Sequence, residues 1–273
     1  MAQLLVFSDI DGTLIDFATY SYAESTPAVT ALLARYIPLI LCSSKTRAEQ
    51  NSLRRDLFIP DPFIVENGSA IFIPPGVFSF DFSHRVVDGW QVVELGVTAV
   101  AIRHTLAAIR QETGLVFHGF ADLSTAEVAA VTGLDEAAAR RAQQREYSET
   151  LVTPFQPEEL AQLQMALAAR GLAVVSGGKF HTVTGAGSDK GTAVAHLTAL
   201  YRQQLGAVVT VGVGDSANDA PLLTAVDQPY LVQRPGGVWN EMDVVGLERV
   251  TAVGPRGWRQ AIEGIIQTGN WKA

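Results

Sequence analysis

The clearest hydrophobic pattern in the chain is an unbroken apolar segment that ends in two carboxylates. Residues 4–7 are all apolar, and Asp9, Asp11 and Gly12 follow closely. Apolar residues on both faces are typical of a strand buried inside a parallel α/β sheet. Ligands bind at the carboxyl ends of such strands, so Asp9 and Asp11 are candidate site residues. Two uncompensated carboxylates are costly to bury, which favours a cation as their partner.

A second apolar strand is predicted over residues 208–213, and it ends in another acidic loop that contains Asp215 and Asp219. Between the two acidic loops, Lys190 stands at the start of a predicted helix that runs to about Gln204. Taken alone, Lys190 is simply an exposed helical lysine, and one acidic loop is simply a turn. Two such loops at strand ends, with a lysine between them, indicate a functional site.

Two further polar segments follow predicted strands. Residues 37–42 predict a strand that ends at Ser43 and Ser44, where a helix over about 46–57 begins. A helix N-terminus with free N–H groups can bind an anion, although on this segment alone helix capping is the simpler interpretation. Residues 63–65 predict a third strand, which is followed by Glu66 and Asn67.

From about residue 84 the alternation of strands and helices becomes irregular. Residues 86–95 alternate weakly, as one half-exposed strand does. Further elements are predicted as helices at about 99–112, 124–133, 135–144 and 157–170, and as strands at 149–152 and 172–175. Regular α/β order returns at residue 177, with strands at 180–184 and 208–213, a last strand at 230–232 and a final helix at 256–267. We therefore expect an α/β fold, with a doubly wound parallel-sheet core over 1–83 and 177–273 and an inserted α+β domain over 84–176.

Composition excludes several classes of protein. The chain has 273 residues, of which 48% are hydrophobic, so it can bury a sizeable core. Its net charge of −8 argues against nucleic acid or an anionic membrane as the main partner. The single cysteine, Cys42, rules out an internal disulfide. No apolar segment approaches the ~20 residues that span a bilayer, and we expect a cytoplasmic protein. The sequence leaves the oligomeric state open.

The candidate residues favour magnesium and phosphoryl chemistry. Carboxylates alone make an oxygen-only site, which suits Mg²⁺. An EF-hand calcium loop counted from Asp9 would need glycine and glutamate where Leu14 and Tyr20 stand. The histidines lack the spacing of a zinc site. A nucleotide-binding P-loop is excluded as well, because that motif needs the lysine after the glycine, whereas Lys190 precedes Gly191. Serine-hydrolase and dinucleotide-binding glycine motifs are absent from the sequence.

These motifs resemble those of the haloacid dehalogenase superfamily of phosphotransferases. The match comprises, in order, Asp9-Ile10-Asp11-Gly12-Thr13, Ser43, Lys190 and Gly214-Asp215-Ser216-Ala217-Asn218-Asp219. The resemblance implies a Rossmann-like core, with Asp9 as nucleophile and Asp11 as general acid and base. It implies that Ser43 and Lys190 hold phosphoryl oxygens, with Ser44 as a further candidate. It also implies that Mg²⁺ is held by Asp9, the backbone carbonyl of Asp11 and Asp215, with Asp219 steadying the site.

Other segments resemble mannosyl-3-phosphoglycerate phosphatases in particular. They are Ser44 to Glu49, Phe63 to Gly68, Ala121 to Ser124, Arg145 to Glu149, Gly177 to His181, and Val232 to Gly237. This resemblance implies an α+β cap and hydrolysis of mannosyl- or glucosyl-3-phosphoglycerate to mannosylglycerate or glucosylglycerate. Because such a substrate carries a sugar and a carboxylate, the candidate substrate-binding residues are Glu66, Asn67, Arg145, Lys179 and His181, with Arg47 as a further candidate. For each cap residue, a plain surface role is about equally expected.

Three alternatives remain at this point. A broader sugar-phosphate phosphatase, acting on sucrose phosphate or hexose phosphates, would use the same core. A phosphomutase would return the phosphoryl group to a sugar instead of to water. A sensor that binds sugar phosphates without catalysis is a third class, although all the expected catalytic groups are present. The sequence does not distinguish mannosyl from glucosyl substrates.

Overall fold

The apolar segment at the N-terminus forms β1 (Gln3–Ser8), which lies inside a nine-stranded sheet. The computed structural model describes residues 2–177 and 180–269. The order of the strands in the sheet is β12-β11-β10-β1-β2-β3-β4-β6-β5. The strands from β12 to β3 are parallel, and β4, β6 and β5 continue the sheet in antiparallel pairings. Their bounds are β2 (Leu39–Cys42), β3 (Phe63–Val65), β4 (Ala70–Ile73), β5 (Arg85–Val87), β6 (Trp90–Glu94), β10 (Val208–Gly214), β11 (Gln228–Gln233) and β12 (Glu248–Val253).

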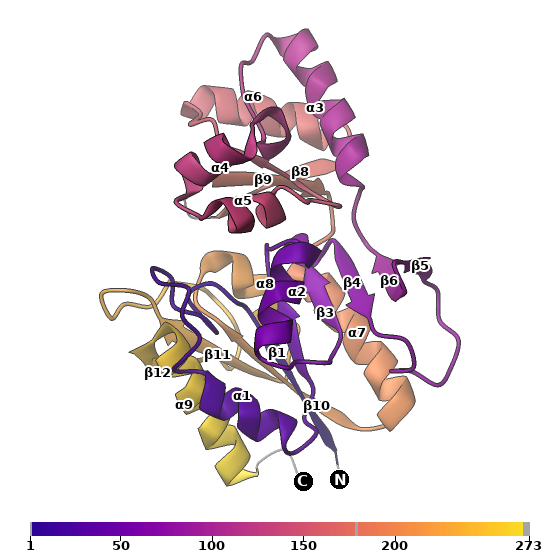
Figure 1. Cartoon of the computed structure of the whole chain (residues 1–273), viewed down its shortest axis with the longest axis vertical. Helices are drawn as coiled ribbons and strands as arrows, with labels where there is room; N and C mark the ends of the chain where they lie inside the picture. The colour runs from indigo at the N-terminus through magenta and orange to yellow at the C-terminus, as the bar shows by residue number, and fades with distance from the viewer. Residues whose placement is uncertain (1, 178–179, 270–273) are drawn as a thin grey trace.

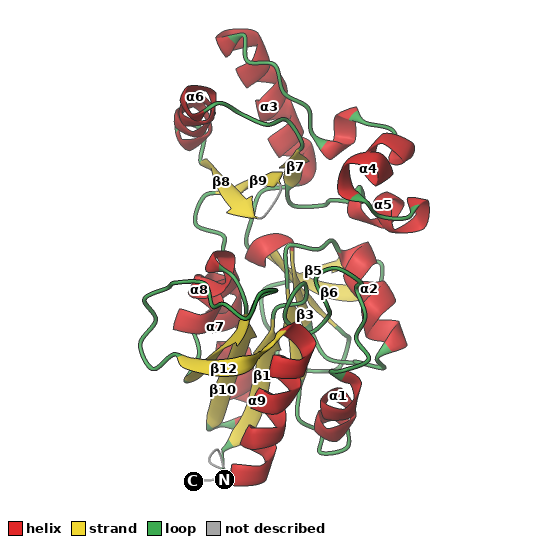
Figure 2. Ribbon diagram, turned by 90° about the vertical axis from the view of Figure 1, so that its left-hand side faces the viewer, coloured by secondary structure: helices red, strands yellow, loops and turns green. Residues whose placement is uncertain are grey.

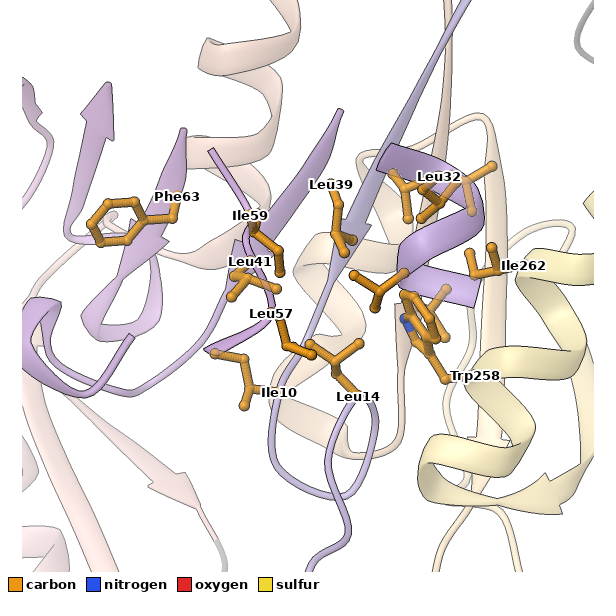
Figure 3. Packing of buried hydrophobic residues seen from close by; sticks show 14 of the residues in the cluster. Ile10, Leu14, Leu32, Leu39, Leu41, Leu57, Ile59, Phe63, Trp258 and Ile262 are labelled. Carbon is orange, nitrogen blue, oxygen red and sulfur yellow. The ribbon is translucent and has the colours of Figure 1, made fainter. Parts of the chain in front are cut away.

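Helices cover both faces of this sheet, which confirms the doubly wound α/β core (Figures 1 and 2). The helices α1 (Thr26–Leu33) and α9 (Gly254–Thr268) pack on one face, and α7 (Lys190–Leu205) and α8 (Ala220–Thr224) pack on the other. On the first face, Trp258 and Ile262 of α9 lie beside Leu32 of α1 and Leu39 of β2 (Figure 3). This apolar burial on both faces explains the continuous hydrophobic runs of β1 and β10.

A smaller unit sits over the carboxyl ends of the parallel strands (Figure 1). It contains a three-stranded antiparallel sheet in the order β7-β9-β8, formed by β7 (Glu149–Leu151), β8 (Leu172–Gly177) and β9 (Phe180–Gly185). Its helices are α3 (Ala99–Thr113), α4 (Thr125–Thr132), α5 (Glu136–Ala142) and α6 (Pro157–Ala168). Leu106 and Leu163, from α3 and α6, pack with Leu151 and Val183 of this sheet in a core of their own. We refer to this unit as the cap.

The two short helices predicted at about 124–133 and 135–144 form as α4 and α5. Ser124 Oγ accepts a hydrogen bond from Glu127 N at the start of α4, and the Glu127 carboxylate accepts one from Ser124 N, which makes a capping box. Gly133 ends α4 in the left-handed conformation, and Asp135 caps the next helix, α5. Local capping chemistry therefore determines where these helices break.

Three expectations about strands were wrong or incomplete. Residues 86–95 form two strands instead of one, because Asp88 and Gly89 both adopt positive φ and close a tight hairpin. This hairpin pairs with β4 in the main sheet and not with the strands of the cap. The strand at 230–232 is not the last one, since β12 follows it at the polar edge of the sheet. The predicted strand at 180–184 forms, as β9, but it pairs within the sheet of the cap.

Two further segments matter for the site. The 3₁₀ helix η1 (Glu66–Gly68) follows β3, and the 3₁₀ helix η3 (Ala217–Asp219) follows β10. The helix α2 (Arg47–Asp56) begins after β2. Its N-terminal capping residue, Thr46, forms a reciprocal capping box with Glu49. Among the residues that the structure describes, no helix is both long and apolar enough to cross a membrane.

Candidate active site

Three carboxylates converge where β1 and β10 end. The two strands are adjacent and parallel, with Ser8 opposite Val213, so the residues that follow them meet at one edge of the sheet. Asp9, Asp215 and Asp219 are all buried there, and one carboxylate oxygen from each lies within 4.8 Å of the others. The sequence analysis predicted this convergence from strand ends alone.

Lys190 partly neutralises this cluster. Its ammonium nitrogen lies 2.6 Å from Asp9 Oδ1 and 2.6 Å from Asp219 Oδ1. Burial of Lys190 acts to lower its pKa, but the neighbouring Asp219 and Asp9 outweigh burial and raise it, so the side chain stays charged. Lys190 is the first residue of α7, where Asp189 caps the helix by accepting a hydrogen bond from Thr192 N at 2.7 Å.

The loop after β10 is held by hydrogen bonds that involve Asp219 itself. Asp219 Oδ2 accepts from the backbone N–H groups of Asp215 (3.1 Å) and Ser216 (3.0 Å). Both oxygens of Asp219 are therefore engaged, one with Lys190 and one with the backbone. Asp219 fixes the loop, and it leaves Asp9 and Asp215 with the better-placed oxygens for a metal ion.

The sequence analysis gave no role to three residues that contact Asp215. Thr13 Oγ1 donates to Asp215 Oδ1 at 3.3 Å, and Arg234 Nε lies 3.4 Å from Asp215 Oδ2. Asn240 Nδ2 donates to the backbone oxygen of Asp215 at 2.9 Å. Thr13 and Arg234 belong to the quoted motifs, so their contacts near Asp215 could have been predicted. Asn240 lies in a segment without a recognisable pattern, so its contact could not.

The electrostatics of the cluster fit a divalent cation. Burial, and then repulsion by Asp219, raise the pKa of Asp9 well above its ordinary value. The same two causes raise the pKa of Asp215 to about 6. Among the described residues, these three carboxylates pair with Lys190 and, at a longer distance, with Arg234, so negative charge is in excess in this part of the structure. An all-oxygen donor set with excess negative charge is suited to Mg²⁺.

Gly12 allows the first loop to approach the second closely. Its φ is +77°, a conformation that side-chain-bearing residues rarely adopt. A Cβ at this position would lie only 2.9 Å from Asp215 Oδ2. Both the backbone conformation and the available space therefore require glycine between Asp11 and Thr13.

Asp11 lies at the mouth of the site and is the most exposed of the four acidic residues. Its side chain is 28% exposed, and Asp11 Oδ1 lies 3.0 Å from Lys45 Nζ. Lys45 is also 3.6 Å from Glu49 Oε1. Burial acts to lower the pKa of Lys45, but Asp11 and Glu49 together raise it above its ordinary value, so Lys45 is a fixed cation beside Asp11.

The predicted hydroxyl and amide residues lie on the neighbouring strand ends. Ser43 is buried at the end of β2, and its hydroxyl accepts from Lys45 N at 3.3 Å. Asn67 N donates to Ser43 O at 3.0 Å, which joins η1 to this strand end. Asn67 Oδ1 is buried without a hydrogen-bond partner among the described residues. Ser44 is half-buried, and its carbonyl accepts from Arg145.

We expected Glu66 to contact the substrate, but its carboxylate is buried and binds the backbone and a hydroxyl of the cap. It is fully buried, and its oxygens accept from Glu146 N (2.8 Å), Tyr147 N (3.1 Å) and Ser148 Oγ (2.5 Å). Its carboxylate therefore holds residues 146–148 of the cap against the core. Burial raises the pKa of Glu66, while Arg145 at 4.0 Å and these donors act to lower it.

The other predicted substrate residues differ in their surroundings. Arg145 is nearly buried and donates to Ser44 O (3.3 Å) and Ser148 Oγ (2.8 Å), while its Nε has no partner among the described residues. Arg47 is already paired with Asp88 and Glu146, in ion pairs of 2.9 and 3.0 Å. His181 lies on β9 and contacts Ser176 at 3.1 Å, and the neighbouring strand β8 lies next to η3. Lys179 lies outside the described residues.

Comparison with known proteins agrees with this geometry. Residues 6–234 match the family of haloacid dehalogenase-like hydrolases. A glucosyl-3-phosphoglycerate/mannosyl-3-phosphoglycerate phosphatase from Methanococcoides burtonii is 41% identical over 268 residues, which cover 97% of this chain and 98% of the relative. A phosphatase with the same name from Persephonella marina is 30% identical over 264 residues, covering 96% and 97%.

Solved structures show the same fold at low sequence identity. A phosphatase of the haloalkanoate enzyme superfamily from Bacteroides thetaiotaomicron aligns with a TM-score of 0.67 at 17% identity, covering 98% of this chain and 96% of that one. A protein from Thermotoga maritima aligns with a TM-score of 0.67 at 17% identity, covering 97% and 98%. With the site geometry and the near full-length relatives, these findings establish that the chain belongs to the haloacid dehalogenase-like hydrolase family.

Proposed function

We propose that this protein is a Mg²⁺-dependent phosphatase that hydrolyses the phosphate monoester of glucosyl-3-phosphoglycerate and mannosyl-3-phosphoglycerate. The observation that carries the substrate assignment is the near full-length similarity, at 41% and 30% identity, to two phosphatases named for these compounds. The chemistry is supported by the cluster of Asp9, Asp215, Asp219 and Lys190 at the strand ends.

Asp9 is the proposed nucleophile. One of its carboxylate oxygens forms a bond to phosphorus, while the bond between phosphorus and the glycerate oxygen breaks. Lys190, 2.6 Å from Asp9, acts to lower the pKa of this carboxylate and orients it, and it lies where it can also offset charge on the phosphoryl oxygens. Ser43, with Ser44 and Asn67 beside it, supplies hydrogen-bond donors from the neighbouring strand end.

Asp11 is the proposed general acid and base. It gives a proton to the departing glycerate oxygen, and it then accepts a proton from the water that attacks the aspartyl-phosphate. That attack releases inorganic phosphate and restores Asp9. The partial exposure of Asp11 gives it access to water, and Lys45 holds its carboxylate in place.

A bound Mg²⁺ would supply positive charge that offsets the charge of the phosphoryl oxygens. Asp9, Asp215 and the backbone carbonyl of Asp11 would hold the ion, and Asp219 would keep the loop after β10 in position. Thr13 and Arg234, which contact Asp215, would orient that ligand.

The cap is the proposed specificity domain. We place its first boundary near Leu95 instead of residue 84, because β5 and β6 pair with β4 in the main sheet. The second boundary lies near Gly185, because β9 pairs with β7 and β8 and not with the main sheet. Arg145, His181 and Lys179 remain candidate substrate contacts, whereas Glu66 acts through the 146–148 segment that it holds.

The test is phosphate release, with Mg²⁺, from a panel of glucosyl-3-phosphoglycerate, mannosyl-3-phosphoglycerate, sucrose phosphate and hexose phosphates. We expect the two glycosyl-phosphoglycerates to exceed the others in kcat/KM by at least about 100-fold, since polar groups dedicated to one substrate discriminate strongly. A flat profile would instead support a broader sugar-phosphate phosphatase. A requirement for a hexose bisphosphate would support a phosphomutase. The Mg²⁺ requirement is tested separately: we expect excess EDTA to abolish turnover.

A further inference from the structure

A cavity of about 270 Å³ lies between the core and the cap, beside the proposed catalytic residues. The core contributes the loop after β1 and residues of α2, and the cap contributes the connection between α4 and α5 together with residues of α5. Figure 1 shows α5 above α2. The residues that line it and matter here are Tyr20, Tyr22, Ser52, Asp56, Ala138 and Arg141. Its volume is close to the lower limit for small-molecule sites, ~300 Å³, so it suits a ligand about the size of one sugar ring.

Two residues connect this cavity to the reaction centre. Lys45 lines the cavity and lies 3.0 Å from Asp11 Oδ1. Ile15 also lines it, and its backbone is bridged to that of Asp11. The cavity is therefore adjacent to Asp11, which gives its proton to the leaving oxygen in the proposed reaction. The core and the cap meet at its rim, where Thr46 Oγ1 donates to Arg141 O at 2.9 Å.

The lining combines aromatic rings with polar groups that the protein does not use internally. Among the described residues, the side chains of Ser52, Asp56 and Arg141 make no hydrogen bond or ion pair. Tyr20 and Tyr22 offer an apolar ring and a hydroxyl each. Hydroxyl groups of a ligand both donate and accept, so they match a mixed set of carboxylate, hydroxyl and guanidinium partners.

The charge of the lining disfavours an anion. Glu49, Asp56 and Asp135 are acidic, whereas Lys45 is already paired with Asp11 and Glu49, which leaves Arg141 as the cation of this lining without a partner in the described structure. A phosphate or carboxylate would meet excess negative charge in this cavity. A neutral polyhydroxylated ligand would not.

Tyr20 is held in place by a strongly bonded loop. Its φ is 57°, which is uncommon for a bulky residue, and its side chain is 45% exposed. Asp16 Oδ1 accepts from Ala18 N (3.1 Å) and from Thr19 N (2.8 Å), and Tyr20 N donates to Asp16 O at 2.9 Å. The Tyr20 ring lies 5.5 Å from Lys45 Nζ, at the wall of the cavity. This loop presents an aromatic surface to the ligand at the cost of backbone strain.

From these observations we infer that this cavity is the subsite for the hexose ring of the substrate. The ring lies against Tyr20 and Tyr22, and its hydroxyl groups bond to Ser52, Asp56 and Arg141. The inference rests on the proposed function, and it assigns sugar recognition to the junction of α2, α5 and the loop after β1. The glycerate carboxylate and the phosphate then remain on the side of Ser43 and Arg145.

The test compares two substitutions in the cavity with one beside it. Ala138→Phe fills the cavity from α5, and Arg141→Ala removes its unpaired cation. Arg140→Ala is the matched control, because Arg140 is the preceding residue on α5, does not line the cavity and is paired with Glu136 at the surface. For each protein, kcat/KM is measured with glucosyl-3-phosphoglycerate and mannosyl-3-phosphoglycerate. The Kd of inorganic phosphate, which carries no sugar, is measured by calorimetry with Mg²⁺ present.

We expect Ala138→Phe and Arg141→Ala to lower kcat/KM at least tenfold, with a change in phosphate affinity of less than twofold and with no effect of Arg140→Ala. Unaltered kcat/KM in both cavity variants would overturn the subsite. An equal loss of phosphate affinity would also overturn it, because the substitutions would then act through the catalytic centre. Failure of the unsubstituted enzyme to hydrolyse either glycosyl-phosphoglycerate would instead contradict the proposed function.

Discussion

Lys190 allows three carboxylates to share one buried space. It pairs at 2.6 Å with both Asp9 and Asp219, and its own charge is stabilised by them despite complete burial. Removing one partner of such a pair leaves a buried charge without compensation, which typically costs about 3–5 kcal/mol. The same residues therefore have two effects: they create a reactive carboxylate at Asp9, and they make the site costly to fold without a cation.

Substitution of Asp9 by asparagine should abolish catalysis without unfolding the protein. An amide cannot form the covalent phosphoryl intermediate, so we expect kcat to fall at least about 10³-fold. Lys190 keeps its other partner, Asp219, in this variant, so no buried charge is left without compensation. Burial and Asp219 disfavour the ionised form of Asp9 and raise its pKa, so loss of the carboxylate should not lower the free energy of unfolding. Steady-state phosphate release and circular dichroism check both parts. Substantial turnover by the folded variant would refute the nucleophile assignment.

Lys45 provides a second prediction at this scale. Lys45→Met removes the cation that lies 3.0 Å from Asp11, so the carboxylate loses its fixed orientation. We expect kcat to fall by about 10- to 100-fold, which is less than the ~10²–10⁴-fold that general acid–base catalysis contributes in full, because Asp11 is misplaced and not removed.

Glu49→Gln is the matched control for Lys45. It neutralises the other partner of Lys45 but keeps the reciprocal capping of α2 with Thr46, since glutamine serves in that motif as well. A loss of kcat in Glu49→Gln as large as that in Lys45→Met would show that the pair with Asp11 is not responsible.

At the level of elements, the contact between η1 and the cap decides how the two units are held together. Glu66 follows β3 in the core, yet its carboxylate binds residues 146–148, which lie some 80 positions later in the chain. Tyr147 adds a hydrogen bond from its hydroxyl to Glu94 at 2.9 Å, and Arg47 adds an ion pair to Glu146. The junction is therefore a polar network that is satisfied from both sides.

Glu66→Gln should weaken this junction. The amide NH₂ of glutamine would face N–H and O–H donors, so we expect the free energy of unfolding to fall by about 3 kcal/mol. Ser148→Ala removes only one of the donors and should cost about 1 kcal/mol. Urea denaturation measures both changes, and hydrogen exchange at the amides of Glu146 and Tyr147 locates them. Equal costs for the two variants would contradict the three-bond network.

Sequence patterns predicted elements well where the information was local. Strand ends located Asp9 and Asp215, and capping residues such as Asp135 located helix starts. The hairpin of β5 and β6 was missed, although Asp88 and Gly89 are a strong turn signal, because weak alternation on both sides was interpreted as one strand. The partner of Glu66 could not be predicted, because a contact between residues 80 positions apart produces no repeating pattern in the sequence.

For the whole molecule, the excess negative charge of the site links stability to pH and metal. The pKa of Asp215 is raised to about 6 and that of Asp9 is raised as well. A carboxyl group whose pKa is higher in the folded than in the unfolded protein stabilises the fold while it is protonated, below about pH 4. That contribution is lost as pH rises through about 6, and the loss is on the order of 3 kcal/mol for Asp215.

Stabilisation by Mg²⁺ should therefore grow with pH. A cation offsets the ionised carboxylates, so we expect the increase in Tm on adding Mg²⁺ to the EDTA-treated protein to be larger at about pH 7.5 than at about pH 5. Thermal unfolding at the two pH values, with and without Mg²⁺, measures the difference. Asp215→Asn is expected to reduce it. A metal effect that is independent of pH would argue against a carboxylate site.

The path of the chain between core and cap has a consequence for how such enzymes diversify. The chain leaves the core just after β6 and returns at the end of β9, where a Cβ placed on Gly185 would lie 3.1 Å from Val97 N. Because the two crossing points are adjacent in space, replacing the continuous segment between β6 and the end of β9 would exchange the entire cap and leave the core sheet unbroken. A transplanted cap would need a segment that fits Glu66 and the other core groups at the junction, such as Arg47 and Glu94. The contacts that the cap makes with a substrate would thus be inherited as one segment, separately from the phosphoryl-transfer chemistry and from the sugar contacts that we propose for the core.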